Sequence, residues 1–170
     1  MQVDRKQPYE FISFEDKNNT YAFVTEHLIV YEIKFKPSSY IFSETTSFIQ
    51  DTFEFIIEVA ENPTSKSPPL DSKIPVTISL IFQDFFTLKE KVVVYICDDS
   101  DSKGKVRNRK FSQWFEQYNP LSFVKLDFAF GSDEDKYFTT LIMRIDNPYM
   151  AEIVSSFQTL SVKYESNSPK

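Results

Sequence analysis

Alternating apolar and polar positions divide the N-terminal part of the chain into short strands. Over residues 28–36, Ile33 and Phe35 fall on one side, and Glu32 and Lys34 fall on the other. This period of two is typical of a strand with one buried face. Turn formers separate the first two runs and favour a hairpin. We expect an antiparallel meander over residues 8–60, with strands at 9–14, 20–25, 28–36 and 52–60 and a loop at 38–51 that holds a short strand or one turn of helix.

The proline-rich segment 61–70 separates this meander from a second half with helical spacing. It holds three of the nine prolines and has no core pattern, so it reads as an exposed connection. Asp71 or Ser72 is suited to cap a following helix, and Pro75 is tolerated in its first turn. The apolar residues expected to lay this helix on the sheet are Ile74, Ile78, Ile81, Phe85 and Leu88.

The most unusual stretch is a predicted strand, turn and helix over residues 92–118. The short β-branched run 92–97 predicts a buried strand. Three carboxylates follow, Asp98, Asp99 and Asp101, and then five cations, Lys103, Lys105, Arg107, Arg109 and Lys110. Four aromatic residues at helical spacing complete the stretch: Phe111, Trp114, Phe115 and Tyr118.

The remaining chain predicts a strand hairpin, 123–130 and 137–145, and a last helix that starts at Asn147-Pro148. The fold class is therefore α+β, with a mixed, mainly antiparallel sheet of about seven strands and three helices packed on one face. We expect a single domain over residues 1–165. Its second half, 71–162, runs helix, strand, helix, hairpin, helix, and 166–170 form a frayed tail.

The amino-acid composition excludes several classes of functional site but does not identify one. Two glycines in 170 residues are too few for a glycine-rich phosphate loop. The single cysteine, Cys97, and the single histidine, His27, cannot form an internal disulfide or a Cys/His zinc site. Cys97 is expected to be a small buried hydrophobe, and His27 is expected to lie in a solvated turn. We therefore expect no cofactor.

Charge is distributed unevenly along the chain. The net charge is −6, yet residues 103–110 carry five cations and no carboxylate. An acidic body disfavours general nucleic-acid binding, although one local patch could contact phosphate. No apolar segment reaches membrane-spanning length, and residues 1–6 lack a signal-peptide hydrophobic region. The expected location is the cytoplasm, without a membrane partner.

Several phrases of the sequence resemble a family of uncharacterised bacterial proteins, mainly from Bacteroidetes, that is known as a domain of unknown function. The likeness covers nearly the whole chain and is most secure over the C-terminal two-thirds. It implies a cytoplasmic single-domain bacterial protein and brings no activity or catalytic residue. The phrases that carry it are Tyr95–Asp98 with Ser100-Asp101, Arg107–Phe111, Trp114-Phe115, Ile78 to Phe86, and Asp146–Pro148 with Glu152-Ile153 and Phe157.

More than one interpretation remains open for both the carboxylates and the cations of the strand–turn–helix. The carboxylates Asp98, Asp99 and Asp101 could bind a metal, or they could only cap the next helix, and capping is the more common role. The basic residues Lys103, Lys105, Arg107, Arg109 and Lys110, with Trp114, form the candidate binding set. They could form a solvated face, contact an acidic protein or read phosphate.

The sequence favours a non-enzymatic interaction or regulatory module over an enzyme, because few catalytic residue types are present. It would bind a protein partner, or a second copy of itself, through residues 98–114. The alternative is a phosphodiester-directed enzyme or an RNA- or DNA-binding protein, with a metal on the 98–101 carboxylates and phosphate held by the 103–110 cations.

Overall fold

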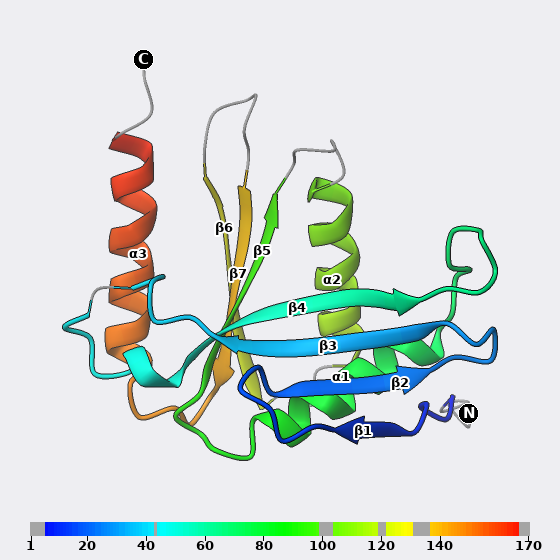
Figure 1. Cartoon of the computed structure of the whole chain (residues 1–170). Coiled ribbons are helices and arrows are strands. Elements are labelled where there is room, and N and C mark those ends of the chain that lie inside the picture. The colour runs from blue at the N-terminus through cyan, green and yellow to red at the C-terminus, as the bar shows by residue number, and fades with distance from the viewer. Residues whose placement is uncertain (1–5, 43, 99–103, 119–121, 131–136, 167–170) are drawn as a thin grey trace, which may run out of the picture.

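The structure, a computed structural model, describes residues 6–42, 44–98, 104–118, 122–130 and 137–166. One mixed sheet has the strand order β1-β2-β3-β4-β5-β7-β6, and three helices pack on it (Figure 1). The predicted α+β class is confirmed. The strands are β1 (Phe11–Ser13), β2 (Thr20–Val24), β3 (Val30–Pro37), β4 (Thr52–Glu61), β5 (Val92–Asp98), β6 (Phe123–Phe130) and β7 (Tyr137–Arg144), and the helices are α1 (Lys73–Phe85), α2 (Gly104–Tyr118) and α3 (Met150–Ser166).

The predicted meander is present as β1 to β4, each strand antiparallel to the next. Ile33 and Phe35 are completely buried on one face of β3. On the other face Lys34 pairs with Glu32 at 3.1 Å and with Glu58 of β4 at 2.7 Å. The alternation in the sequence therefore separates a core face from a charged, water-facing one.

Strands β4 and β5 are parallel, and their pairing is short. Their register covers Thr52 to Glu54 against Val92 to Val94, after which the two strands diverge (Figure 1). The connection between them is α1, as a parallel pair requires. On the helix side an aromatic cluster fills the angle between the strands, where Phe111 of α2 contacts Phe55 of β4 and Tyr95 of β5 at ring distances of 5.7 and 4.6 Å.

Helix α1 begins where the sequence predicts and ends earlier than expected. The Asp71 carboxylate accepts the backbone N–H of Lys73 at 2.9 Å, so Asp71 rather than Ser72 is the capping residue. The helix ends at Phe85 because the Thr87 hydroxyl donates to the Asp84 carbonyl at 2.6 Å and turns the chain. Leu88 was expected on the inner face of the helix, which was wrong: it lies beyond the helix and is exposed.

The helices do not share one face of the sheet, as the sequence suggested. Helices α1 and α2 cover one face, and α3 covers the opposite face of the β5-β7-β6 end (Figure 1). The reason lies in β5, where Val92, Val93 and Val94 are all completely buried. Val93 belongs to the core beneath α1, and its two neighbours belong to the core beneath α3. A strand with consecutive apolar residues must be covered on both faces.

The loop before β4 completes the second core. It contains one short helical turn, η1 (Ile49–Asp51), and brings Phe42 and Phe48 against Phe157 of α3. The described residues of this segment, 38–42 and 44–51, are therefore a loop with a turn of helix, one of the two predicted forms. At the start of α3, the Asn147 side chain accepts the N–H of Tyr149 at 2.8 Å, which is the expected cap.

Candidate functional site

Helix α2 is held to the sheet by its aromatic face. Phe111 is buried, while Trp114 and Phe115 are only partly buried against the same core. Gly104, the first residue of the helix, is also buried. The predicted aromatic face is confirmed, and one flank of α2 remains open to solvent.

The basic residues of α2 point in different directions. At about 100° per residue, Arg107 and Arg109 lie about 160° apart around the helix. Lys105 and Arg109 are exposed on the outer side, away from the sheet. Arg107 is half-buried and lies near Tyr95. Burial and a hydrogen bond with Cys97 raise the pKa of Tyr95, and the positive charge of Arg107 partly offsets this rise. Arg107 and Arg109 therefore lie on different faces of α2.

Lys110 and Trp114 lie one turn apart on the open flank. The Lys110 ammonium is 5.1 Å from the centre of the Trp114 ring, within the range of a cation–π contact. Among the described residues, no carboxylate forms an ion pair with Lys110. This flank thus presents one cation and one large aromatic surface together.

A groove runs beside this flank. Its base is formed by Tyr31 of β3 and Ile57 of β4, and one wall is formed by residues 68–72. Lys110, Trp114, Gln117 and Tyr118 of α2 form the opposite wall. The groove encloses about 1050 Å³ of empty space, part of which is open solvent. Leu70 is 93% exposed at its edge, so an apolar side chain faces water there.

A smaller apolar cleft lies between α1 and α2. It encloses about 420 Å³, also open to solvent, and is lined by Phe82 and Phe111 among other apolar side chains. Pro75, Trp114 and Tyr118 line both this cleft and the groove. Trp114 therefore stands at the boundary between two adjoining recesses.

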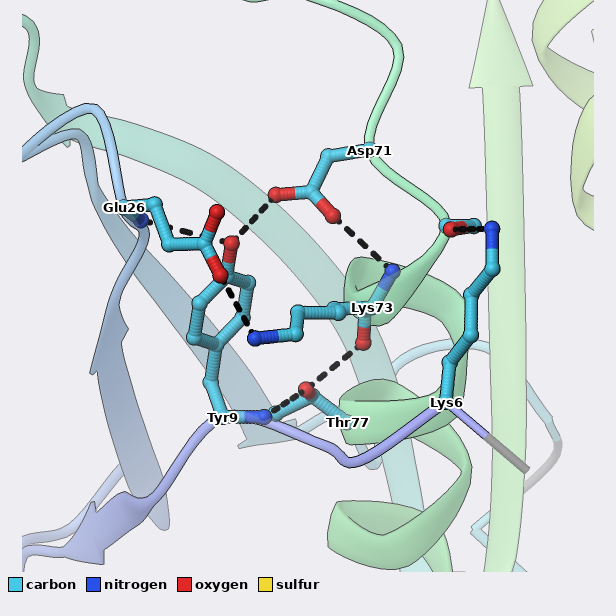
Figure 2. Close-up of polar contacts among 7 residues, drawn as sticks. Lys6, Tyr9, Glu26, Asp71, Lys73 and Thr77 are labelled. Carbon is cyan, nitrogen blue, oxygen red and sulfur yellow. Dashed lines mark hydrogen bonds and ion pairs between the residues drawn. The ribbon is translucent and has the colours of Figure 1, made fainter. Parts of the chain in front are cut away.

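The N-terminal segment fixes the wall formed by residues 68–72. The Tyr9 hydroxyl donates to the Asp71 carboxylate at 2.5 Å, and Lys6 donates to the Ser72 hydroxyl at 2.6 Å (Figure 2). Burial and this hydrogen bond to Asp71 raise the pKa of Tyr9 to about 12. The Asp71 carboxylate is thus committed to Tyr9 and to the N–H of Lys73.

The same residues connect the meander to the start of α1. Lys73 forms an ion pair with Glu26 at 2.6 Å, and its ammonium lies 5.0 Å from the centre of the Tyr9 ring (Figure 2). The backbone N–H of Tyr9 donates to the Thr77 hydroxyl at 2.9 Å. The sequence contains no signal for these contacts, because their partners lie about 50 to 70 residues apart.

We compared the sequence with models of known protein families. The model of a family of unknown function, DUF6169, matches residues 70–159, more than half of the chain. The chain belongs to DUF6169. The resemblance to a family of unknown function is confirmed over these residues. The comparisons with curated proteins and with solved structures found no match.

The DUF6169 match begins at the wall of the groove. It includes α1, β5, α2, β6, β7 and most of α3, and it excludes β1 to β4. The small apolar cleft is therefore lined entirely by matched residues. The groove is lined on one side by matched residues and at its base by Tyr31 and Ile57 of the meander.

The candidate metal ligands fall largely outside the described residues. Asp98 ends β5, and Asp99, Asp101 and Lys103 lie outside the described residues. Within the described ranges, no three His, Cys, Asp or Glu side chains are grouped to hold a metal ion. Cys97 is buried and His27 is exposed in a turn, as expected. In the same ranges, no helix is long and apolar enough to cross a bilayer.

One polar cluster under α2 was not predicted. The Thr140 side chain of β7 is completely buried and donates to Asp127 of β6 at 2.6 Å. Asn108 of α2 lies 3.4 Å from the same hydroxyl, and Lys125 pairs with Asp127. Lys125 and Asp127 alternate with apolar residues on β6, as polar residues do on an ordinary half-buried strand, so the sequence did not mark them as a cluster. They connect α2 to the edge of the sheet.

Proposed function

We propose that the protein is a binding module that holds a segment of a partner protein in the groove between residues 68–72 and α2. The observation that carries this proposal is the pair of Lys110 and Trp114 on the groove wall, opposite the exposed Leu70. Aromatic and cationic side chains at the centre of a recess are the usual anchors of a protein interface. The setting we propose is a bacterial cytoplasm.

The lining of the groove defines the partner's chemistry. Trp114 and Leu70 offer apolar surface for an apolar or aromatic side chain. Lys110 offers a positive charge for a carboxylate. The nearby Asp71 carboxylate accepts hydrogen bonds from Tyr9 and from the Lys73 N–H, which orient it within the protein. An apolar residue followed by an acidic one fits this arrangement.

The charge distribution favours the same partner. The whole chain carries −6, whereas residues 103–110 carry five cations and no carboxylate. An acidic segment is attracted to α2 and repelled by most of the remaining surface, which orients its approach. The remaining, acidic surface is also unfavourable for nucleic acid, because phosphate groups bind to broad positively charged surfaces.

The single tryptophan of the chain allows a direct test. Wild-type protein is panned against displayed random dodecapeptides, and enriched peptides are synthesised and titrated while Trp114 fluorescence is recorded. We expect enriched peptides to combine an apolar residue with a nearby carboxylate and to change the emission on binding. Lys110→Glu should weaken binding at least about tenfold, which corresponds to about 1.4 kcal/mol.

Lys105→Glu is the matched control, because it makes the same charge change on the same helix but on the outer side. It should leave binding within about twofold of the wild type, the small effect expected of a charge outside the contact. Equal losses in the two variants would show that only overall charge matters. Absence of any enriched peptide would overturn the proposed function.

A further inference from the structure

We propose that the partner segment binds as an added β-strand along the free edge of β4, beside the groove. This inference rests on the proposed function and specifies how its ligand is held. It starts from the short pairing between β4 and β5, which ends at Glu54 and Val94. Strand β4 continues for seven more residues, to Glu61, and β3 pairs with it on the opposite edge.

The direction of the main-chain groups on β4 follows from two hydrogen bonds. The N–H of Phe35 donates to the Asn18 carbonyl at 2.9 Å, away from β4, and Phe35 stands opposite Phe55. In an antiparallel ladder, opposed residues alternate between hydrogen-bonded and non-hydrogen-bonded pairs. Ile57 is two residues beyond Phe55, so its own N–H and C=O also point away from β3.

The N–H of Ser38, which points in the opposite direction to that of Phe35, confirms this assignment. It donates to the Thr52 carbonyl at 3.0 Å, so the even-numbered positions of β4 from Thr52 face β3 and the odd-numbered ones face away. Within the described residues, no strand pairs with β4 on that side beyond Glu54. An exposed edge of this kind is a template for an extended chain.

The groove lies where such a strand would place its side chains. Ile57 contributes to the base of the groove, and its side chain is on the same face of the sheet as α2. Every second residue of a strand added beside Ile57 would therefore point toward Trp114 and Lys110. Main-chain bonds would supply affinity, and the pair on α2 would select an apolar and an acidic side chain.

The aromatic cluster keeps this edge available. Phe111 packs against both Phe55 and Tyr95, so α2 holds β4 and β5 apart on the helix side. Phe55 and Tyr95 also contact each other at 5.3 Å. Closing the angle between the strands would require these buried rings to move, at the cost expected for repacking a core. The opening is therefore a built feature of the fold.

The test removes one main-chain donor. Ile57→Pro deletes the N–H that faces the opening and leaves the β3 ladder intact, since proline is tolerated where the N–H of an edge strand faces solvent. We expect Ile57→Pro to bind the selected peptides at least about tenfold more weakly, or about 1.4 kcal/mol. Ile57→Ala, which keeps the N–H, should lose less. Circular dichroism verifies that both variants are folded.

Two further measurements do not depend on the proline variant. Two versions of each peptide are compared, one N-methylated at its odd-numbered residues and one at its even-numbered residues. One version should bind weakly and the other normally, because only every second N–H of an added strand faces β4. Amide exchange at Ile57 should slow when an unmodified peptide is bound. A peptide that binds through a helix would show neither effect.

The outcomes separate the two proposals. Some peptides could shift Trp114 emission, bind the Ile57→Pro variant as tightly as the wild type, and leave amide exchange at Ile57 of the wild type unchanged. That result would overturn strand addition but not binding in the groove. If no peptide is enriched or shifts Trp114 emission, the protein-partner function itself would be overturned, and strand addition with it. Peptide binding with phase-dependent methylation and protection of Ile57 supports both.

Discussion

Helices α1 and α2 lie on the same face of the sheet and are attached to it very differently. Seven of the thirteen residues of α1 are buried, including Ile78, Ile81 and Phe85. In α2, fifteen residues long, only Gly104 and Phe111 are buried. The first helix is a structural element of the core. The second is anchored by one aromatic face and leaves a flank for contact with other molecules.

This difference shows how stability and recognition are divided in the fold. A helix that is buried over half its length has its side chains fixed by packing, and each change there costs stability. The flank of α2 that carries Lys110 and Trp114 can change with little loss of core packing. We therefore locate binding on α2 and expect substitutions on the two helices to have distinct consequences.

The largest expected effect is on α1. Phe85 is 2% exposed and stacks on Phe35 with ring centres 3.8 Å apart. Its replacement by alanine should lower the free energy of unfolding by about 3–5 kcal/mol, because it leaves a cavity in the core. Trp114→Ala, on the half-buried flank, should cost less than half as much. Urea denaturation followed by circular dichroism measures both losses. Equal losses would contradict the conclusion that α1 contributes more to stability than the flank of α2.

The sequence predicted most elements because most have one buried face. Alternation placed β3 and β4, and helical spacing placed α1, α2 and α3, with errors of only a few residues at their ends. The predicted position of α3 was wrong. A repeating apolar pattern shows that one face of a helix is buried, but it does not show on which face of the sheet the helix packs. Leu88 was misassigned because apolar spacing continued past the point where Thr87 ends the helix.

The candidate site was predictable only in part. Lys110 and Trp114 were members of a candidate set of five cations and one tryptophan, and these two line one wall of the groove. The other parts of the groove come from residues distant in the sequence, Tyr31, Ile57 and the wall at Asp71. No local pattern connects such positions, because a recess between segments is created by tertiary packing. Arg107 and Arg109 belong to the same candidate set but lie on different faces of α2, because residues two positions apart on a helix are separated by about 160°.

The next effect concerns the cap that fixes both α1 and the groove wall. Asp71→Ala removes the acceptor for the Lys73 N–H and for the Tyr9 hydroxyl. We expect a loss of about 1–2 kcal/mol, the range for a helix cap. Ser72→Ala is the matched control, because Ser72 makes no capping hydrogen bond and should lose less. A larger loss for Ser72→Ala would contradict the assignment of the cap.

A smaller effect depends on pH. The raised pKa of Tyr9, about 12 against an ordinary 10.0, means that the folded state holds this proton more tightly than the unfolded state. The stabilisation is therefore fully present below pH 10 and is lost as the pH rises from about 10 to 12. Tyr9→Phe should be less stable at neutral pH and should lose less additional stability over this window.

The comparison of wild type with Tyr9→Phe is necessary because other tyrosines titrate in the same range. Burial and a hydrogen bond with Asp84 also raise the pKa of Tyr21, which contributes to the alkaline loss in both proteins. Only the difference between the two curves belongs to Tyr9. Parallel curves from pH 9 to 12 would show that the proton on Tyr9 does not couple the N-terminal segment to the groove wall.

The smallest expected effect on stability is at Lys110, where the effect on binding is expected to be large. Lys110→Ala removes a cation that contacts the Trp114 ring at 5.1 Å and has no described ion pair. Its loss should change the free energy of unfolding by no more than about 0.5–1 kcal/mol, the worth of an exposed cation–π contact. A side chain that the fold hardly requires, yet that is held beside the only tryptophan on a groove wall, is suited to a ligand. A stability loss as large as that of Phe85→Ala would instead make Lys110 part of the structural core and would remove the distinction between the two helices.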